Sequence, residues 1–452
     1  MMMQLPIFSV RSRGGMCRLA VLMAAVMLPA WNAASVDKAA GTQAGWPEFR
    51  GPHGNGIAGA ADGAQPLDLP LEWSETENIV WKTPIPHKGW STPVVLDGDI
   101  WLTTATGEGH DFYAVCVDFE TGAVRFNEQV FHCDHPEPLG NNVNCYASPS
   151  PVIAPGRVFV HFGSYGTACL DTATAEVIWK RDDLPCRHYR GPGSSAMLYK
   201  DLLILTFDGV DVQYMAALDT KTGKTVWKTD RSTQWTDLDE NGNPKREGDY
   251  RKAFSTPLVA GTAKGPQLLT VGSSAAFAYE PLTGREIWTL PLPGYTPAAR
   301  PVFADGVAYI TSGRGEQMLL AVRVDGQGDV AGSHVVWTRE GRDIPQEPSP
   351  VLVDGLLYIV NNQGVLNCLD AATGETVWRE RLGGNYVSSP IYADGRLYCC
   401  STQGETVVLR AGRAFEVLAE NRLDDGFLAS PAVAGNALIL RTKTHLYRIE
   451  EK

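Results

Sequence analysis

The sequence predicts an all-β fold, an eight-bladed β-propeller of four-stranded blades, and three observations carry this prediction. A nine-residue phrase of an acid, Thr-Gly or a near match, and an aromatic recurs along the chain. A Ser-Pro, Thr-Pro or similar step, followed by apolar residues, recurs with it. A run that carries the aromatic, NIVWKTPI (78–85), stands near the N-terminus ahead of the first unit. Self-similarity at a regular period is typical of propellers, solenoids and repeat arrays.

The nine-residue phrase predicts a tight turn that leads into an outermost strand. The acid can accept backbone amide hydrogen bonds, and Gly supplies a positive φ. The aromatic eight residues after the acid would pack against the next blade. The phrase occurs as DFETGAVRF (118–126), DTATAEVIW (171–179), DTKTGKTVW (219–227), EPLTGREIW (280–288) and DAATGETVW (370–378). In blade five it is stretched, because Asp325 lies twelve residues before Trp337, and blade seven has no aromatic there.

The second phrase marks the start of each blade and gives eight starts. These are STPVV (91–95), SPVI (150–153), SSAML (194–198), STPLV (255–259), ARPVF (299–303), SPVLV (349–353), SSPIY (388–392) and ASPAV (429–433). Between the two phrases lie two short apolar runs, such as 355–360 and 365–370, bounded by Gly, Asn or Asp. Short β-branched and aromatic runs with such boundaries are typical of strands.

The last unit, 429–449, supplies only three strands. The N-terminal run NIVWKTPI (78–85) carries the missing aromatic, Trp81. We therefore expect this run to become the outer strand of the last blade. Such a pairing closes the ring and hides its open edges.

These residues resemble the pyrroloquinoline-quinone-like (PQQ-like) β-propeller repeat family, whose outer strands carry the phrase D-x-x-T-G-x-x-x-W. The match covers about 78–450, and WPEFRGPHGNG (46–56) is similar to the leader of an exported bacterial subgroup. The family contains quinoprotein dehydrogenases, an outer-membrane assembly lipoprotein and many other exported proteins, so the resemblance implies a fold more strongly than an activity.

Residues 1–34 read as a cleaved secretory signal peptide. Arg11, Arg13 and Arg18 form a basic start, and 19–30 is an apolar run too short to span a bilayer. We expect residues 35–77 to be an extended N-terminal segment and residues 78–452 to be the propeller. The mature protein is expected to be periplasmic or secreted, without a membrane span, and a monomer.

The chain has 452 residues and a formal net charge of −12, and removal of the signal peptide takes this to about −15. Such a surface repels nucleic acid. We therefore expect no nucleic-acid partner. The leading interpretation is a non-catalytic module that binds an unknown protein partner or a small ligand, with no cofactor.

Two alternatives remain open. One is a PQQ-dependent dehydrogenase of small alcohols or sugars, in which Trp90 would stack on the quinone and Asp208 or Asp211 would act as base. The other is a subunit of an outer-membrane or envelope assembly complex, which the resemblance also implies.

Ligand binding is expected at one mouth of the ring, from two sets of residues. Residues that precede the inner strands are Trp90, Tyr146, Arg190, Phe254, Arg300, Glu347, Tyr386 and Phe427. Residues in the turns between second and third strands are His110, Tyr165, Asp208, Asp211, Arg314, Asn361 and Gln403. Aromatics, arginines and acids at one opening suit a small polar or peptide ligand.

Two further sites are predicted. Asp237, Asp239 and Asn241 alternate before Gly242 like the first half of a calcium loop, although residue twelve is Gly248 rather than Glu. The alternative is a polar surface hairpin. Cys133 and Cys145 lie in one long loop, and an exported protein favours a disulfide between them, with Cys186 as a possible replacement.

Overall fold

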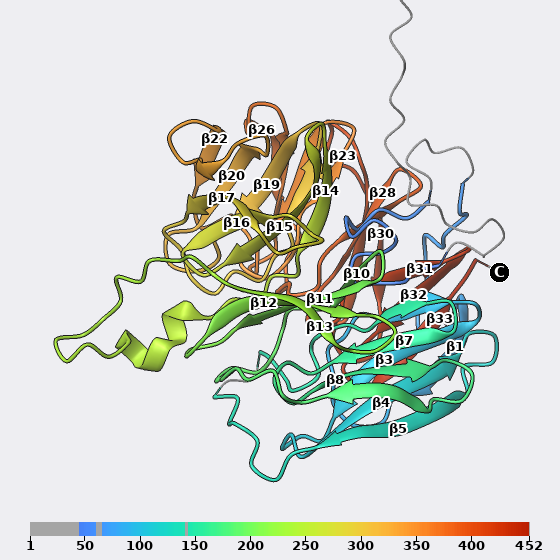
Figure 1. Cartoon of the computed structure of the whole chain (residues 1–452). Coiled ribbons are helices and arrows are strands. Elements are labelled where there is room, and N and C mark those ends of the chain that lie inside the picture. Colours follow the sequence, from blue (N-terminus) through green and yellow to red (C-terminus); the bar gives the residue numbers. More distant parts are fainter. Residues whose placement is uncertain (1–44, 60–65, 141–142, 452) are drawn as a thin grey trace, which may run out of the picture. The chain divides into compact units, whose positions relative to one another are not determined.

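The computed structural model describes residues 45–59, 66–140 and 143–451, which belong to one compact unit, Gly41–Lys452. This unit is the eight-bladed β-propeller that the sequence predicts (Figure 1). The expected signal peptide, residues 1–34, lies outside the described residues. Within the described ranges, no helix combines the length and apolar character needed to cross a membrane.

We number the blades from the first start phrase, and each is an antiparallel sheet listed from its inner to its outer strand. Blade 1 is β2 (Val94–Leu96), β3 (Asp99–Ala105), β4 (Asp111–Asp118) and β5 (Val124–His132); blade 2 is β6 (Val152–Ala154), β7 (Arg157–His161), β8 (Thr167–Asp171) and β9 (Val177–Arg181). Blade 3 is β10 (Met197–Tyr199), β11 (Leu202–Asp208), β12 (Gln213–Asp219) and β13 (Thr225–Asp230); blade 4 is β14 (Leu258–Thr262), β15 (Gly265–Gly272), β16 (Ala275–Tyr279) and β17 (Glu286–Pro291).

The remaining four blades follow the same plan. Blade 5 is β18 (Val302–Ala304), β19 (Val307–Thr311), β20 (Met318–Arg323) and β22 (Val335–Glu340); blade 6 is β23 (Val351–Val353), β24 (Leu356–Val360), β25 (Val365–Asp370) and β26 (Thr376–Arg381). Blade 7 is β27 (Ile391–Ala393), β28 (Arg396–Cys400), β29 (Glu405–Arg410) and β30 (Val417–Arg422); blade 8 is β31 (Ala432–Ala434), β32 (Ala437–Arg441), β33 (His445–Ile449) and β1 (Ile79–Pro84). The 3₁₀ segment η1 (Lys245–Arg251) lies in the long loop between blades 3 and 4.

The second and third strands of each blade form the core. Every residue of β3, β11, β24 and β32 is buried, since both faces of these strands contact neighbouring blades. The outer strand β22 instead alternates half-buried and exposed residues. Continuous apolar runs are typical of strands covered on both faces, and alternation is typical of strands covered on one. The core is therefore a set of interfaces between blades.

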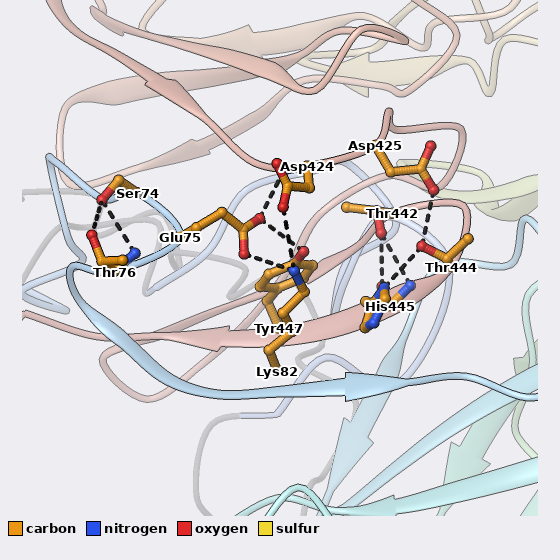
Figure 2. Close-up of polar contacts among 10 residues, drawn as sticks. All are labelled: Ser74, Glu75, Thr76, Lys82, Asp424, Asp425, Thr442, Thr444, His445 and Tyr447. Atoms are coloured by element: carbon orange, nitrogen blue, oxygen red, sulfur yellow. Dashed lines mark hydrogen bonds and ion pairs between the residues drawn. The ribbon is translucent and has the colours of Figure 1, made fainter.

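The ring closes as the sequence predicts, by pairing of β1 with β33. The register runs antiparallel from Ile79 opposite Ile449 to Pro84 opposite His445. Figure 2 shows polar contacts along this seam. The Glu75 carboxylate accepts hydrogen bonds from Lys82 Nζ at 2.8 Å and from the Tyr447 hydroxyl at 3.0 Å. Residues from the first and last parts of the chain thus hold the closure together.

The aromatic of the recurring phrase docks on the turn of the next blade. Five indole Nε1 atoms donate to main-chain oxygens there: Trp81 to Phe119 (2.9 Å), Trp179 to Thr220 (3.0 Å), Trp227 to Pro281 (3.1 Å), Trp337 to Ala371 (3.0 Å) and Trp378 to Gly412 (3.0 Å). The indole ring also lies over the Gly of that turn. A Cβ on Gly223 would stand 2.7 Å from the Trp179 ring, so Gly is needed for contact as well as for its φ of +69°.

Blade 4 departs from this pattern because of the stretched phrase in blade 5. The extra residues form β21 (Gly328–Asp329), which adds to β17 as a parallel strand. Trp288 is fully buried, and its Nε1 donates to Gln267 of its own blade at 3.0 Å. The insertion therefore covers the edge of blade 4 where a docked indole would otherwise lie.

The leader phrase enters the ring and fills one end of the central channel. Trp46 bridges to Val95 of β2, and Ile57 bridges to Tyr392 of β27, which lies in a distant blade. The buried Arg50 guanidinium donates to the main-chain oxygens of Pro350 and Pro390 at the starts of two inner strands. The segment from Trp46 to Ala58 is called the plug below.

Substitution of the docking Gly is expected to destabilise the ring. Gly223→Ala places a Cβ against the Trp179 ring in a left-handed residue, which should cost about 2–4 kcal/mol of unfolding free energy, measured by urea denaturation. Gly306→Ala is the matched control, since Gly306 has φ +80° and nothing within 4 Å of its added Cβ. It should lose only about 1 kcal/mol. Equal losses in the two variants would contradict the docking account.

Candidate functional site

A cavity of about 380 Å³ lies on the ring axis, at the starts of the inner strands. Its base is Phe49 of the plug and six hydroxyl residues, one from each of six blades: Thr92, Ser150, Ser195, Thr256, Ser389 and Ser430. Its walls are formed by the residues two positions earlier in each blade: Trp90, Ser148, Gly193, Phe254, Ala298, Glu347, Val387 and Leu428. Successive strand residues point to opposite sides, so residues two apart share a face.

The hydroxyls at the base link neighbouring blades. The amide of Thr92 donates to Ser150 Oγ, that of Ser150 to Ser195 Oγ and that of Ser195 to Thr256 Oγ1, each at 2.9 Å. The same contact joins blades 5 to 8 through Ser349, Ser389 and Ser430. The hydroxyl of the Ser or Thr before Pro in the start phrase therefore accepts a hydrogen bond from a backbone amide of the preceding blade.

Three irregular loops raise one side of the cavity mouth; we call residues 133–140, 181–193 and 230–252 the rim. The Glu137 carboxylate accepts hydrogen bonds from Arg187 Nε and from the Tyr189 amide, both at 2.9 Å. The Arg190 guanidinium donates to the main-chain oxygen of Gly140 at 3.2 Å and binds Asp249 with two bonds of 2.9 and 3.0 Å. The three loops are thus bonded to one another. In Figure 1 the loop with η1 projects from the blades.

Two arginine–carboxylate pairs lie in the cavity wall. Arg190 pairs with Asp249, and this hydrogen-bonded carboxylate raises the pKa of Arg190. On the other side Arg314 donates to Glu347 at 2.7 Å. Glu347 also accepts from Asn362, and Arg314 is fixed by main-chain bonds with Tyr295. These four charges compensate each other.

Three further cations are stacked on the aromatic residues of the wall. Lys88 Nζ lies 5.4 Å from the Trp90 ring centroid, and Lys252 Nζ lies 4.8 Å from that of Phe254. Arg246 lies 5.1 Å from the ring of Tyr250. Tyr250 in turn contacts the lining residue Tyr295 edge to face, with centroids 4.7 Å apart.

Lys252 is the most unusual of these cations. Its side chain is fully buried, and its Nζ has no hydrogen-bond partner among the described residues. Burial lowers the pKa of Lys252 to about 8. Asp208 and Asp249 oppose this effect from a distance, but both are bonded to arginines. An unpaired buried cation is costly, and such groups concentrate at functional sites.

Of the residues predicted for the mouth, Trp90, Arg190, Phe254, Arg314 and Glu347 line the cavity. Tyr146, Arg300 and Tyr386 do not, and for these the expectation is corrected. Their side chains are buried between structural elements instead. Tyr146 donates its hydroxyl to the main-chain oxygen of Glu137 at 2.8 Å, and Tyr386 belongs to the core between blades 6 and 7.

Arg300 occupies the position that holds a hydroxyl in the other seven blades. Its guanidinium turns to the plug, where it donates to Glu48 at 3.2 Å and to the main-chain oxygen of Phe49 at 2.5 Å. A Cβ on Gly54 would meet this guanidinium at 2.5 Å. Arg300 therefore anchors the plug rather than a ligand in the cavity.

Sequence reasoning missed several lining residues. Arg246 and Asp249 come from an insertion that carries no repeat signal, and Phe49 comes from the leader. Val387 and Leu428 could have been found by counting two residues back from each start-phrase hydroxyl. Choosing the bulkiest residue near each start selected Tyr386 and Phe427 instead.

Cys133 and Cys145 are both free cysteines in this structure, and the disulfide between them stays a prediction. Cys145 Sγ lies 3.4 Å from Ser148 Oγ within the same loop. In the proposed calcium loop, Asp237 pairs with Arg251 at 2.7 Å, and one Asp239 oxygen accepts the amides of Asn241 and Asn243. In the part of the chain described, no three His, Cys, Asp or Glu side chains gather as a metal site.

The two aspartates proposed as the base of a quinone-dependent dehydrogenase have other partners. The quinone would need a base beside it. Asp208 is buried in an ion pair with Arg231, with bonds of 2.6 and 2.7 Å, and Asp211 accepts the Arg187 amide at 2.9 Å. Neither aspartate is among the described residues that line the cavity.

The repeat architecture and the plugged axial cavity define a PQQ-like β-propeller closed at one end of its channel. Comparison with protein families gives a narrower assignment. The chain belongs to the family described as outer membrane protein assembly factor BamB, whose model matches residues 72–250, 213–331 and 329–418.

Individual relatives are distant. BamB of Yersinia pestis is 23% identical over 273 residues, which cover 50% of this chain and 66% of that protein. BamB of Marinobacter adhaerens is 29% identical over 91 residues, which cover 20% of this chain and 23% of that protein. The chain thus spans less than two thirds of the length of both of these curated relatives.

Two solved structures share the fold. The crystal structure of BamB from Moraxella catarrhalis has a TM-score of 0.54 at 12% identity, covering 82% of this chain and 99% of that one. The quinohemoprotein alcohol dehydrogenase from Comamonas testosteroni has a TM-score of 0.63 at 13% identity, covering 90% of this chain and 81% of that one. At these identities the likeness establishes the architecture alone.

Lys252→Met is expected to stabilise the protein. The pKa falls from 10.5 to about 8 on folding, so below pH 8 the buried charge should cost on the order of 3 kcal/mol that Met avoids. Between pH 8 and 10.5 the unfolded chain binds more protons than the folded one, so the wild type gains stability as pH rises and the difference shrinks. Urea denaturation at pH 7 and pH 10 measures both effects.

The exposed Lys221→Met is the control for this prediction and should give a small, pH-independent change. A Lys252→Met variant that is less stable than the wild type at pH 7 would show that polar interactions of the Lys252 ammonium group outweigh the cost of its burial in the folded protein.

Proposed function

We propose that this protein is an exported, non-catalytic binding and scaffold module that works in outer-membrane or envelope assembly. Its family membership and its similarity to outer membrane protein assembly factors support the envelope role. The proposal includes export through cleavage of residues 1–34 and action as a monomer that holds a protein partner.

The observation that carries the proposal is the bonding of the three rim loops to one another. Loops of this length usually move on a scaffold. Here Glu137 joins two of them, and Arg190 joins the same two loops and the third. A surface that is ordered before it meets a partner loses less conformational entropy on binding. The rim is therefore the proposed partner surface.

The rim also carries the groups that protein interfaces favour. Arg187 is more than half exposed beside Glu137, and Val212 and Leu238 are exposed apolar residues on or next to the rim loops. Arginines and apolar side chains are typical of interface centres, and charged residues are typical of their edges. A protein partner would find both on this side of the ring.

The experiment is site-specific photo-crosslinking in the envelope of living cells. A photoreactive residue at Arg187 should give adducts with outer-membrane assembly proteins, identified by mass spectrometry, because Arg187 lies on the rim. The same residue at Glu375, exposed on the turn before β26, serves as the control and should give at most a tenth of that yield.

Charge reversal tests the rim itself. In the chain with the photoreactive residue at position 187, Glu137→Lys removes the remaining bond from the Tyr189 amide to the Glu137 carboxylate. It should lower the adduct at least about fivefold, since a hydrogen bond to a charged group contributes about 1.5–3 kcal/mol. Glu375→Lys should leave the adduct unchanged. Adducts of equal yield from both crosslinking positions would rule out the rim as the partner surface.

A further inference from the structure

The cavity inside the rim has an uneven distribution of charge. Its two wall carboxylates, Asp249 and Glu347, are each bonded to an arginine. Lys88, Arg246 and Lys252 remain, and no carboxylate is bonded to any of them in the described part of the chain. Arg246 lines the cavity, and Lys88 and Lys252 lie on the lining rings of Trp90 and Phe254. The cavity and its immediate surroundings thus carry an excess of positive charge in a protein whose formal net charge is −12.

These three cations are placed where aromatic rings face the cavity. Lys88 and Lys252 stack on the lining residues Trp90 and Phe254, and Arg246 itself lines the cavity. A cation on a ring face is stabilised by the ring quadrupole but keeps its charge. The fields of the three cations therefore add in the cavity. Water screens the charge of the exposed Arg246 more than that of the buried Lys252.

Arg246 is the cation best placed to bind a ligand directly. Its guanidinium has no hydrogen-bond acceptor among the residues described, while its side chain stacks on Tyr250. Its backbone is left-handed, with φ of 49°, and it is followed by two more residues of positive φ, Glu247 and Gly248. This backbone conformation is strained for a non-glycine residue. Such strain persists where the surrounding structure holds the backbone in place.

One side of the wall is apolar. Val387 and Leu428 lie on the blade 7 and blade 8 side next to Trp90 of blade 1, and Phe49 closes the base. The opposite side, blades 3 to 6, holds the arginines. An occupant therefore meets an apolar wall and a cationic wall at once.

We propose that this cavity binds a carboxylate with an apolar body, and that Arg246 receives the carboxylate while Trp90, Val387 and Leu428 contact the body. Guanidinium groups bind carboxylates through paired, charge-assisted hydrogen bonds. The cavity volume of about 380 Å³ is at the small end of ligand sites. The carboxylate belongs either to a small free acid or to the C-terminus of a peptide. The site is independent of the scaffold role proposed above.

Isothermal titration calorimetry of the purified mature protein tests the proposal with matched probes. 3-Phenylpropionate is expected to bind at least about tenfold more tightly than 3-phenylpropan-1-ol, which has the same body without the charge, because one charge-assisted hydrogen bond accounts for such a factor. Propionate, the charge without the ring, should bind more weakly than either. Equal affinity for the acid and the alcohol, or no heat from either at millimolar concentration, overturns the proposal.

Variants assign the binding to this cavity. Arg246→Gln should weaken 3-phenylpropionate about tenfold and leave the alcohol unchanged. Leu428→Asp should weaken both probes. Arg285→Gln, which changes an exposed arginine on the turn before β17, should weaken neither. Circular dichroism and the thermal midpoint confirm that each variant is folded, and full acid affinity in folded Arg246→Gln overturns the assignment of that residue.

A peptide pair identifies the source of the carboxylate. Ala-Ala-Leu with a free C-terminus is compared with the same peptide as its C-terminal amide. Binding of the free acid alone, at least as tight as 3-phenylpropionate, identifies a peptide C-terminus as the ligand class. Binding of 3-phenylpropionate without either peptide identifies a small free acid. Arg246 belongs to the third rim loop, whereas the photoreactive position 187 belongs to the second. Loss of acid binding in Arg246→Gln with intact adducts from position 187 therefore separates this proposal from the scaffold function.

Discussion

The structure depends on one repeated contact, a tryptophan ring of one blade laid over the turn glycine of the next. The indole Nε1 donates to a main-chain oxygen of that turn, so each contact combines burial of a large apolar face with a directed hydrogen bond. The turn is held from the other side by its acid, as where Asp219 accepts the amide and hydroxyl of Thr222. The acid, the glycine and the tryptophan act as one unit across two blades, and Trp81 repeats the contact at the closure of the ring.

A ring built this way has a central channel, and the protein fills part of it. The plug closes one end, where Arg50 and Arg300 bond to main-chain oxygens of inner strands and of the plug itself. Both guanidiniums are buried, and Arg300 pairs with Glu48. Burial, together with the charge of Arg300, lowers the pKa of Arg50 to about 9. The arrangement is costly, but it converts an open channel into a cavity with a base. The hydroxyl contacts between successive blades fix the width of that base.

The repeat made most of the fold predictable, because the phrases encode contacts between identical units. Blade number, strand order and closure at Trp81 all followed from spacing. The cavity was harder to predict. The wall residues are those two positions before each start-phrase hydroxyl. Side-chain size is a poor guide to them, because a bulky neighbour such as Tyr386 packs into the core. Asp249 and Arg246 lie in an insertion with no periodicity, so only the folded loops bring them to the mouth. Arg300 occupies a predicted position, but its partner is the leader, over 250 residues away in sequence.

Arg190 connects the rim with the wall of the cavity. Its guanidinium holds Asp249 in the cavity wall and the main-chain oxygen of Gly140 in the rim. An occupant or a partner that displaced Arg190 from one of these bonds would also change the other. Such a coupling would be reciprocal, since a partner that changes the affinity of the cavity has its own affinity changed by the same factor. The rim and the cavity are separate sites by their chemistry, and this shared arginine is the physical route by which binding at one can alter the other.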